Sequence, residues 1–166
     1  MKKNLTKRIA FKLVLSACLL GPSALALAQD KIKIGEVNSY KAVPAFLEPY
    51  RMGMELAVEQ INQSGGLLGK QVELIRRDDN ANPGDAVRVA EELVTRDQVD
   101  LLTGTFLSHI GLAVTDFAKQ KQVFFLASEP LTDKITWANG NAYTFRLRPS
   151  TFMQVSMLVP MAAATK

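Results

Sequence analysis

The sequence contains one cysteine, Cys18, and one histidine, His109, in 166 residues. Cys18 lies in an N-terminal segment with the features of an export signal, so removal of that segment leaves a chain without a thiol. Such a chain forms no disulfide bond and offers no cysteine nucleophile or metal ligand. A lone histidine with no carboxylate at helical spacing also argues against a transition-metal site.

Two nucleotide-binding patterns are absent as well. Neither GxGxxG nor GxxxxGK[ST] occurs between a strand and a helix, so the sequence gives no support for dinucleotide or nucleoside triphosphate binding. No repeat, low-complexity tract or linker divides the chain. We expect no cofactor and no resident metal ion.

The first 28 residues differ in kind from the rest. They begin with five basic residues and no acidic one, continue through the apolar run LVLSACLLGPSALALA, and end in the small-residue pattern Ala26-Leu27-Ala28. This arrangement predicts a signal peptide, residues 1–28, cut after Ala28. Gly21-Pro22 interrupts the apolar block, which is shorter than the roughly 20 residues that a membrane span needs.

A second processing pattern lies in the same segment. The residues LSAC that end at Cys18 resemble a lipoprotein box, in which the cysteine is acylated and becomes the N-terminus. Only five residues separate Lys12 from Cys18, which leaves a very short apolar region before that cut. Cleavage after Ala28 is therefore favoured over lipoprotein anchoring at Cys18.

Removal of residues 1–28 changes the charge of the chain. Five of the 20 basic residues leave with the signal, so 15 basic residues remain against 16 acidic ones. The basic balance of the full sequence therefore comes from the export signal, and it is no argument for a nucleic-acid partner. The remaining 138 residues, 29–166, suffice for one domain with a real core.

Strand and helix patterns alternate along residues 29–166. KIKIGEV and later short apolar runs have strand character, and the segments between them place apolar residues at helical spacing. Strands are expected at 31–37, 71–77, 99–103, 123–127 and 142–148, with a loop at 38–46 and helices at 48–64, after Asn82-Pro83, after the corner 104–108 and from Ser150. This order predicts an α/β fold with a parallel sheet flanked by helices on both faces.

The loops that follow parallel strands leave the sheet at one edge, where ligands of such sheets bind. At this edge Ser108 is expected to cap the third helix, so its hydroxyl and the next backbone N–H groups would face the loop mouth. A cap alone stabilises a helix by about 0.5 to 2 kcal/mol and needs no ligand. The small residues Gly104 and Thr105 permit close approach and favour a cap that also contacts an anion.

Catalytic and metal roles are less favoured at the same edge. Ser108 and His109 are adjacent at a helix start and project about 100° apart, so they cannot form a nucleophile–base pair. Asp78-Asp79 could bind a divalent cation, but aspartates at a strand end commonly fasten turns through nearby backbone N–H groups. We expect the turn role, and no catalytic residue is assigned.

The motifs, in their order, resemble those of a known family. They are KIKIGEV, GMELAVEQINQSGGLLGKQVELIRRDDNANP, VDLLTG, TFLSHIG, VFFLASEPLT and YTFRLRPS. Together they resemble the first lobe of the periplasmic solute-binding proteins of branched-chain amino acid type ABC importers. The resemblance covers nearly all of residues 29–166, and INQSGGLLGKQVELIRRDDNANP is its most specific part.

The resemblance implies a lobe of the type I periplasmic binding protein fold, a three-layer αβα arrangement. It also implies a periplasmic receptor that passes a small solute to an ABC permease in the inner membrane. Amino-acid-binding members contribute a serine and backbone N–H groups to the ligand carboxylate, and further contacts come from the next loop and from an aromatic residue in the first. The ligand-binding residues expected on this basis are Ser108, Thr105, His109, Glu129, Pro130, Leu131, Phe46 and Tyr40.

Two departures from the family pattern affect the expectation. The serine- and threonine-rich corner of leucine-type receptors is replaced here by Phe106, Leu107, His109 and Ile110, and the small Gly-Ala-Thr stretch of their next loop by Glu129-Pro130-Leu131. An aromatic or other carboxylate, an amide or a urea-like solute therefore fits as well as a branched-chain amino acid. The sequence up to Lys166 contains no counterpart of the family's second lobe. In addition, Pro160 is expected to break the last helical segment. We therefore expect a truncated receptor that binds weakly or not at all alone.

A rival interpretation stays open from the residues alone. A small exported α/β enzyme could use Asp78, Asp79 or Ser108, and a sensor module could share the same lobe. Nothing in the sequence identifies a leaving group or a general base, so the receptor is favoured over the enzyme.

Overall fold

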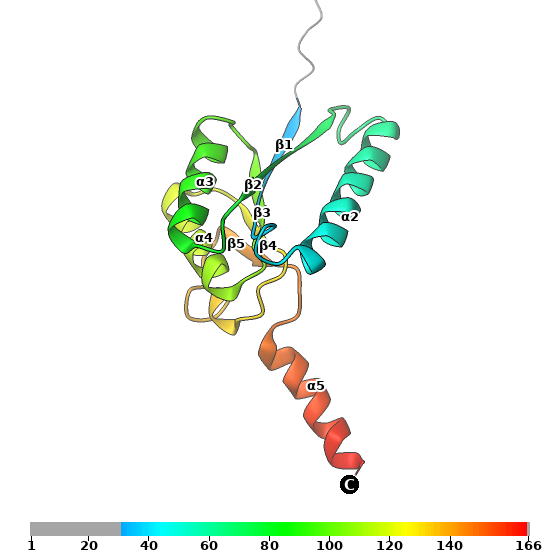
Figure 1. Cartoon of the computed structure of the whole chain (residues 1–166), viewed down its shortest axis with the longest axis vertical. Helices are drawn as coiled ribbons and strands as arrows, with labels where there is room; N and C mark the ends of the chain where they lie inside the picture. Colours follow the sequence, from blue (N-terminus) through cyan, green and yellow to red (C-terminus); the bar gives the residue numbers. More distant parts are fainter. Residues whose placement is uncertain (1–30, 166) are drawn as a thin grey trace, which may run out of the picture.

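The computed structural model describes residues 31–165. The predicted signal peptide, the cut after Ala28 and the lipoprotein cysteine Cys18 lie outside the described residues. Five strands form one sheet in the order β2-β1-β3-β4-β5, with parallel neighbours throughout (Figure 1). The elements, in chain order, are β1 (Ile32–Asn38), α2 (Pro44–Gln63), β2 (Val72–Asp78), α3 (Pro83–Thr95), β3 (Leu101–Gly104), α4 (Ser108–Lys121), β4 (Phe125–Ala127), the 3-10 helix η1 (Asp133–Ile135), β5 (Thr144–Arg146) and α5 (Thr151–Ala164).

This architecture confirms the predicted α/β class. Helices α3 and α4 cover one face of the sheet and α2 lies on the other, so the described residues form three layers (Figure 1). All five predicted strands are present, and the last three are shorter than the sequence pattern indicated.

The hydrophobic core lies between the sheet and the pair α3 and α4. Both helices bury the stripes predicted from their spacing, and Val37, Leu102 and Phe125 of the sheet are fully buried against them. Gly35 of β1 belongs to this packing, because a Cβ there would lie 3.0 to 3.2 Å from side-chain atoms of the core. The buried residues of the two helices are Ala86, Val89, Ala90, Leu93, Ile110, Gly111, Val114, Thr115, Phe117 and Ala118.

Helix α2 is attached to the opposite face by polar contacts. The Asn62 amide bonds both backbone groups of Val72, accepting from its N–H at 2.7 Å and donating to its carbonyl at 2.8 Å. Glu55 forms an ion pair with Arg76 of β2 at 2.6 Å. Leu47 is the one buried residue of this helix, so the apolar stripe predicted along it is only partly covered.

The predicted start of this helix is wrong. The sequence pattern placed the start at Glu48, after a loop over 38–46, but α2 begins at Pro44. Proline is compatible with the first helical position because its fixed φ suits the helix and its missing N–H would have no intrahelical partner there. The earlier start brings Phe46 from the predicted loop into the first turn of α2.

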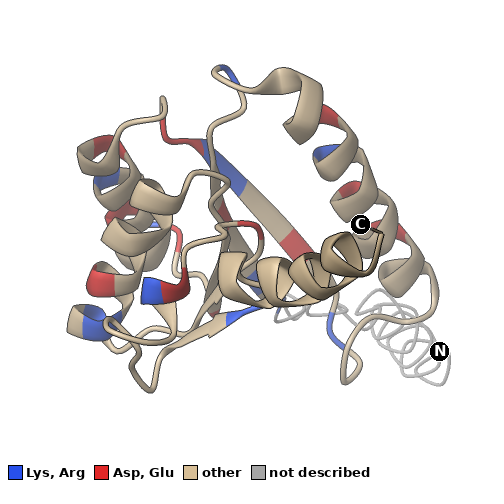
Figure 2. Cartoon of the chain, turned by 90° about the horizontal axis from the view of Figure 1, so that it is seen from below, with Lys and Arg blue, Asp and Glu red and all other residues tan. Residues whose placement is uncertain are grey.

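Helix α5 extends away from the sheet and buries none of its residues (Figure 1). Ser150 caps it by accepting from the Met153 N–H at 3.3 Å. The prediction that Pro160 breaks this segment is wrong, since the helix continues to Ala164. Water can reach the carbonyl left without a donor, because α5 is exposed along its length. Its side chains carry no charge (Figure 2). Within the described residues, no helix combines the length and apolarity needed to cross a membrane.

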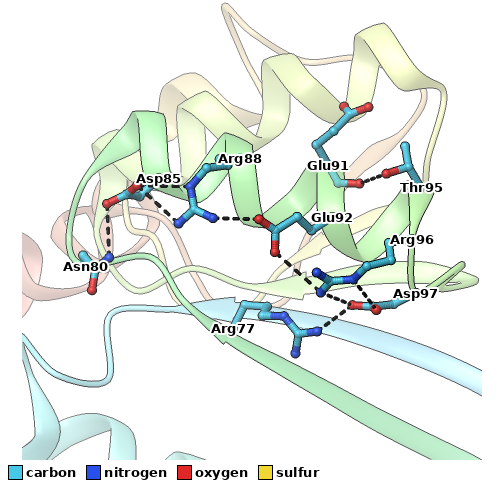
Figure 3. A network of polar contacts seen from close by, with 9 residues as sticks. All are labelled: Arg77, Asn80, Asp85, Arg88, Glu91, Glu92, Thr95, Arg96 and Asp97. Carbon is cyan, nitrogen blue, oxygen red and sulfur yellow. Dashed lines mark hydrogen bonds and ion pairs between the residues drawn. The ribbon is translucent and has the colours of Figure 1, made fainter.

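A line of ion pairs and hydrogen bonds runs along α3 and joins it to β2 (Figure 3). It reaches the sheet through the pair between Arg77 of β2 and Asp97, two residues after the end of α3, at 2.7 Å. The exposed pairs of the network, such as that between Arg88 and Asp85, contribute about 0 to 1 kcal/mol each. The remaining members are Asn80, Asp85, Arg88, Glu91, Glu92, Thr95 and Arg96.

Candidate functional site

The strand order reverses between β1 and β3, because the chain passes from β1 outward to β2 and then returns to the other side of β1. In open parallel sheets the ligand crevice lies beyond the carboxyl ends of the strands at such a reversal. The loops that meet there follow β1, β2, β3 and β4. These loops carry five of the eight residues predicted to contact a ligand, and the other three lie in the first turns of the helices that follow: Phe46 in α2, and Ser108 and His109 in α4.

The corner between β3 and α4 holds an unusual backbone. Gly104 has φ 107°, and a Cβ there would lie 2.4 Å from the Val37 carbonyl oxygen. Thr105 follows at φ 64° and donates its N–H to the same oxygen at 2.7 Å. A β-branched residue in the left-handed region costs on the order of 1 to 3 kcal/mol, a strain that is concentrated at functional sites.

The Thr105 side chain adds a second signal. The residue is fully buried, and among the described residues its hydroxyl has no hydrogen-bond partner. An unpaired buried hydroxyl costs about 1 to 3 kcal/mol, so this position combines strain with an unsatisfied polar group. Such a combination makes Thr105 the strongest ligand-binding candidate at this corner.

Ser108 does not cap α4 as predicted. Leu107 occupies the cap position without a side-chain hydrogen bond, and Ser108 is the first helical residue. The Ser108 hydroxyl instead accepts from the Thr132 N–H at 3.2 Å, which joins α4 to the loop after β4. The backbone N–H groups of the first turn still have no intrahelical acceptor, and the helix dipole favours an anion near them.

His109 is exposed on the first turn of α4. Burial raises the pKa of the nearby Asp79 carboxyl, and the hydrogen bonds that this carboxyl accepts from Ser39 and Ala81 oppose the shift. The Ser39 hydroxyl donates to Asp79 Oδ1 at 2.6 Å. This serine therefore binds the carboxylate and not the imidazole, so the three residues do not form a nucleophile–base unit.

The predicted turn role of Asp78-Asp79 is confirmed. Asp78 accepts from the N–H groups of Asn80 at 2.8 Å and Lys41 at 2.9 Å, and Asp79 accepts from the Ala81 N–H at 2.8 Å. Across residues 31–165, no group of three or more His, Cys, Asp and Glu side chains is placed to hold a metal ion.

An aromatic pair forms an apolar wall beside the corner. Phe46 of α2 stacks on Phe106, with ring centroids 5.5 Å apart and an interplanar angle of 29°. Phe46 is 66% exposed, so most of its ring faces solvent. Aromatic rings in such a position supply apolar contact area for a ligand.

The loop after β4 is held by the sheet and by α5. Pro130 is buried against Gly111, where a Cβ would lie 2.9 Å from the proline ring. The Leu131 carbonyl accepts from the Thr151 N–H at 2.9 Å. Arg146 of β5 donates to the Pro130 carbonyl at 2.6 Å and to the Thr132 carbonyl at 3.1 Å. The loop that carries Glu129 is therefore fixed through its backbone.

A buried polar cluster lies between the sheet and the start of α2. Glu36 of β1 is fully buried and accepts from the Tyr40 hydroxyl at 3.0 Å. Burial raises the pKa of Glu36 to about 8, with the Tyr40 bond opposing the shift. Burial and the neighbouring Glu36 also raise the pKa of Tyr40. Tyr40 thus directs its hydroxyl toward Glu36.

Sequence reasoning missed part of this edge. The sequence pattern does not point to Glu36, to Asn38 or to Tyr50, whose hydroxyl donates to Ser128 Oγ at 3.2 Å. It marks Phe106 only as a departure from a family pattern. Glu36 occupies a polar position of the alternating strand KIKIGEV, which normally faces water. An acidic residue buried between a strand and a covering helix indicates a functional site. That burial becomes visible only when the position of α2 over this face is known.

Comparisons with known proteins find a matching family model and related sequences. Residues 31–166 match the family model described as periplasmic binding protein. The chain is 31% identical over 147 residues to the leucine-, isoleucine-, valine-, threonine-, and alanine-binding protein of Pseudomonas aeruginosa, covering 88% of this chain and 38% of that one. It is 35% identical over 148 residues to an amino acid binding protein of the same organism, covering 89% and 38%. The chain thus spans about two-fifths of the length of these relatives.

Solved structures share the fold. The branched-chain amino acid transporter substrate-binding protein LivJ of Streptococcus pneumoniae, in complex with isoleucine, superposes with a TM-score of 0.67 at 28% identity, over 73% of this chain and 34% of that one. A solute-binding protein of Rhodopseudomonas palustris in complex with benzoate gives a TM-score of 0.66 at 26% identity, over 73% and 33%. These neighbours are solute-binding proteins of ABC transporters and not enzymes.

Proposed function

The chain belongs to the periplasmic binding protein family, and we propose on that basis that residues 29–166 form the amino-terminal lobe of an extracytoplasmic solute-binding subunit of an ABC importer. Its solutes are amino acids or related small carboxylates and amides. The family match, the curated relatives named as amino-acid-binding proteins and the neighbours solved with isoleucine and with benzoate support this.

The observation that carries the proposal is the β3–α4 corner. Thr105 is strained, fully buried and has an unpaired hydroxyl, and it lies three residues before the start of α4 at Ser108. A carboxylate placed there would accept from that hydroxyl and from first-turn N–H groups, in the field of the helix dipole. Ser108 and His109 lie on the same turn and complete this anion subsite.

The remaining predicted contacts surround the anion subsite. Phe46 offers an apolar face to the solute, and Glu129 lies on the fixed loop after β4. Pro130 and Leu131 hold that loop in place through their contacts with Gly111 and Thr151. Tyr40 positions Glu36 by donating its hydroxyl to the Glu36 carboxyl group.

One lobe covers only one side of a solute. Since the other side of a bound molecule would face water, we expect residues 29–166 alone to bind with an affinity in the millimolar range, about −4 kcal/mol. Within the proposal, a second lobe closes on the solute, the complete receptor works in the periplasm, and its partner is an ABC permease of the inner membrane.

The test is a titration of the ¹⁵N-labelled protein with leucine and with benzoate up to about 10 mM, followed by amide chemical shifts. We expect saturable shifts at residues 104–109 and at residues 129, 131 and 132 with at least one of the two compounds; Pro130 has no amide proton. Thr105→Val should weaken them several-fold. Thr115→Val is the matched control, because Thr115 is also fully buried with an unpaired hydroxyl but lies in the middle of α4. Shifts confined to other regions, or equal effects of the two variants, would contradict the proposal.

A further inference from the structure

The carboxyl group of Glu36 packs against the backbone of the β3–α4 corner. A Cβ at Gly104 would lie 2.9 Å from Glu36 Oε1. Glu36 is fully buried, and within residues 31–165 this oxygen has no hydrogen-bond partner. The residue after Gly104 is Thr105, whose buried hydroxyl is also unpaired. The corner assigned to a solute carboxylate therefore has a carboxyl group of the protein directly beside it.

The groups that face Glu36 from β2, α2 and the loop after β1 leave a negative charge on it unbalanced. The Tyr40 hydroxyl of that loop donates to Glu36 Oε2 at 3.0 Å, and Tyr50 of α2 lies near the same carboxyl group. Arg76 of β2 is a nearby cation, but its guanidinium pairs with Glu55 at 2.6 Å. One neutral hydrogen bond and a cation that is already paired compensate a buried charge only weakly.

The loop after β4 brings a second acid to this cluster. Glu129 lies close enough to Glu36 for their carboxyl groups to repel each other when both are ionised. Asn38 of β1 lies beside both, without hydrogen-bond geometry to either. Burial is the largest effect and raises the pKa of Glu36 to about 8, although the Tyr40 bond opposes the shift. Glu36 is therefore mostly neutral at pH 7 and mostly ionised at pH 9.

We propose that Glu36 determines the charge that the β3–α4 corner accepts: its neutral carboxyl group admits an anionic solute, and its ionisation repels that solute. The inference rests on the proposed function and adds control of the same site by protons. It applies to any solute that places a carboxylate at the anion subsite. Gly104 makes this control direct, because a side chain there would fill the place that Glu36 Oε1 occupies.

The physical reason is the repulsion between two like charges in a buried place. Away from water, neighbouring charges are screened far less than at the surface. Since the protein with neutral Glu36 binds the solute more tightly, a bound solute carboxylate must in return raise the pKa of Glu36. Solute affinity is therefore highest while Glu36 is protonated, and it falls as the pH rises through about 8.

The experiment titrates benzoate and leucine into the protein at pH 7, 8 and 9, a range above the ordinary titration of histidine near pH 6.5. Threonine and valine methyl groups carry ¹³C, so that the Thr105 methyl reports binding and the buried Val114 methyls report that the protein stays folded. We expect the affinity for a compound that binds to fall about 5-fold from pH 7 to pH 9. In Glu36→Gln the fall should be less than about 2-fold, because the amide stays neutral.

The matched control is Glu59→Gln on the exposed far half of α2, which should keep the full fall in affinity. A second measurement needs no variant. The ¹³C shift of the Glu36 carboxyl carbon is followed against pH with and without saturating solute. Bound solute should raise the midpoint of this titration by about 1 pH unit, the counterpart of an affinity that differs about 10-fold between the two protonation states.

Each result has a separate meaning. Affinity independent of pH in the parent protein, or a fall that persists in Glu36→Gln, would overturn the role of Glu36 and leave the proposed receptor function standing. A fall that disappears in Glu129→Gln and persists in Glu36→Gln would also overturn it, in favour of the second acid. Binding of neither compound at the corner at any of these pH values would overturn the receptor function and the role of Glu36 together.

Discussion

The Arg146 guanidinium donates to the Pro130 carbonyl oxygen at 2.6 Å, and the same side chain donates to the carbonyls of Thr132 at 3.1 Å and Arg148 at 2.9 Å. One residue of β5 thus fixes both ends of the loop segment that follows Glu129. Burial lowers the pKa of Arg146, but an arginine remains charged at any physiological pH. The position of Glu129 therefore depends on a side chain that need not touch the solute.

Replacement of Arg146 should loosen this loop. We expect Arg146→Met to lower the free energy of unfolding by about 2 kcal/mol, because three carbonyl oxygens lose charged donors. The amide protons of residues 129, 131 and 132 should exchange faster, by at least the factor by which the equilibrium constant for global unfolding rises. Urea denaturation and native-state hydrogen exchange measure the two effects.

The control for this variant is Arg88→Met. Arg88 takes part in exposed ion pairs with Asp85 and Glu92, so its loss should cost about 0.5 kcal/mol or less. Arg146→Lys should recover only part of the loss, since an ammonium cannot reproduce the planar fork of donors. Equal destabilisation by Arg146→Met and Arg88→Met would mean that the guanidinium does not anchor the loop.

Glu36 should make stability depend on pH. Its pKa rises from 4.5 in its ordinary state to about 8 in the folded protein, mainly through burial. Between these values the folded state binds more protons than the unfolded chain, so stability falls as pH rises from about 4.5 to about 8. The loss over this window is at most on the order of 5 kcal/mol for this one group.

Glu36→Gln should remove most of that slope while keeping an acceptor for the Tyr40 hydroxyl. Urea denaturation at several values between pH 5 and pH 9 measures it. A smaller slope of the same sign should remain, because burial also raises the pKa of Asp79 and Glu129. Glu59→Gln should leave the slope unchanged. A parent protein whose stability rises from pH 5 to pH 8 would contradict the assignment.

Much of the architecture follows from local sequence patterns. The helices α3 and α4 bury the apolar stripes that their spacing indicates, and Asn82 with Pro83 begins α3 as expected, with the Asn82 side chain accepting from the N–H groups of Gly84 and Asp85. These features depend on residues close in the sequence. They are therefore visible without knowledge of tertiary contacts.

The site is only partly visible in this way. The loops of a parallel sheet share one edge, so the general location follows from strand order alone. Strand order does not predict the cluster of Glu36, Asn38 and Glu129. This cluster forms because α2 covers one face of β1 and because the loop after β4 reaches the same place. Ser108 shows the same limit: its bond to Thr132 joins residues 24 positions apart, which no local capping pattern predicts.

Gly104 gives the most direct test of the corner geometry. Gly104→Ala should destabilise the protein by about 3 kcal/mol or more, because its φ of 107° disfavours any other residue and the new Cβ would lie 2.4 Å from the Val37 carbonyl oxygen. That carbonyl cannot move freely, since it also accepts from the Thr105 N–H at 2.7 Å. Gly53→Ala is the control, because nothing lies within 4 Å of a Cβ at Gly53 of α2. Alanine there should stabilise the helix by about 0.5 to 1 kcal/mol, and urea denaturation of both variants measures the difference. If Gly104→Ala were as stable as Gly53→Ala, the close approach of β1 and β3 would be wrong, and with it the strained presentation of Thr105 on which the anion subsite depends.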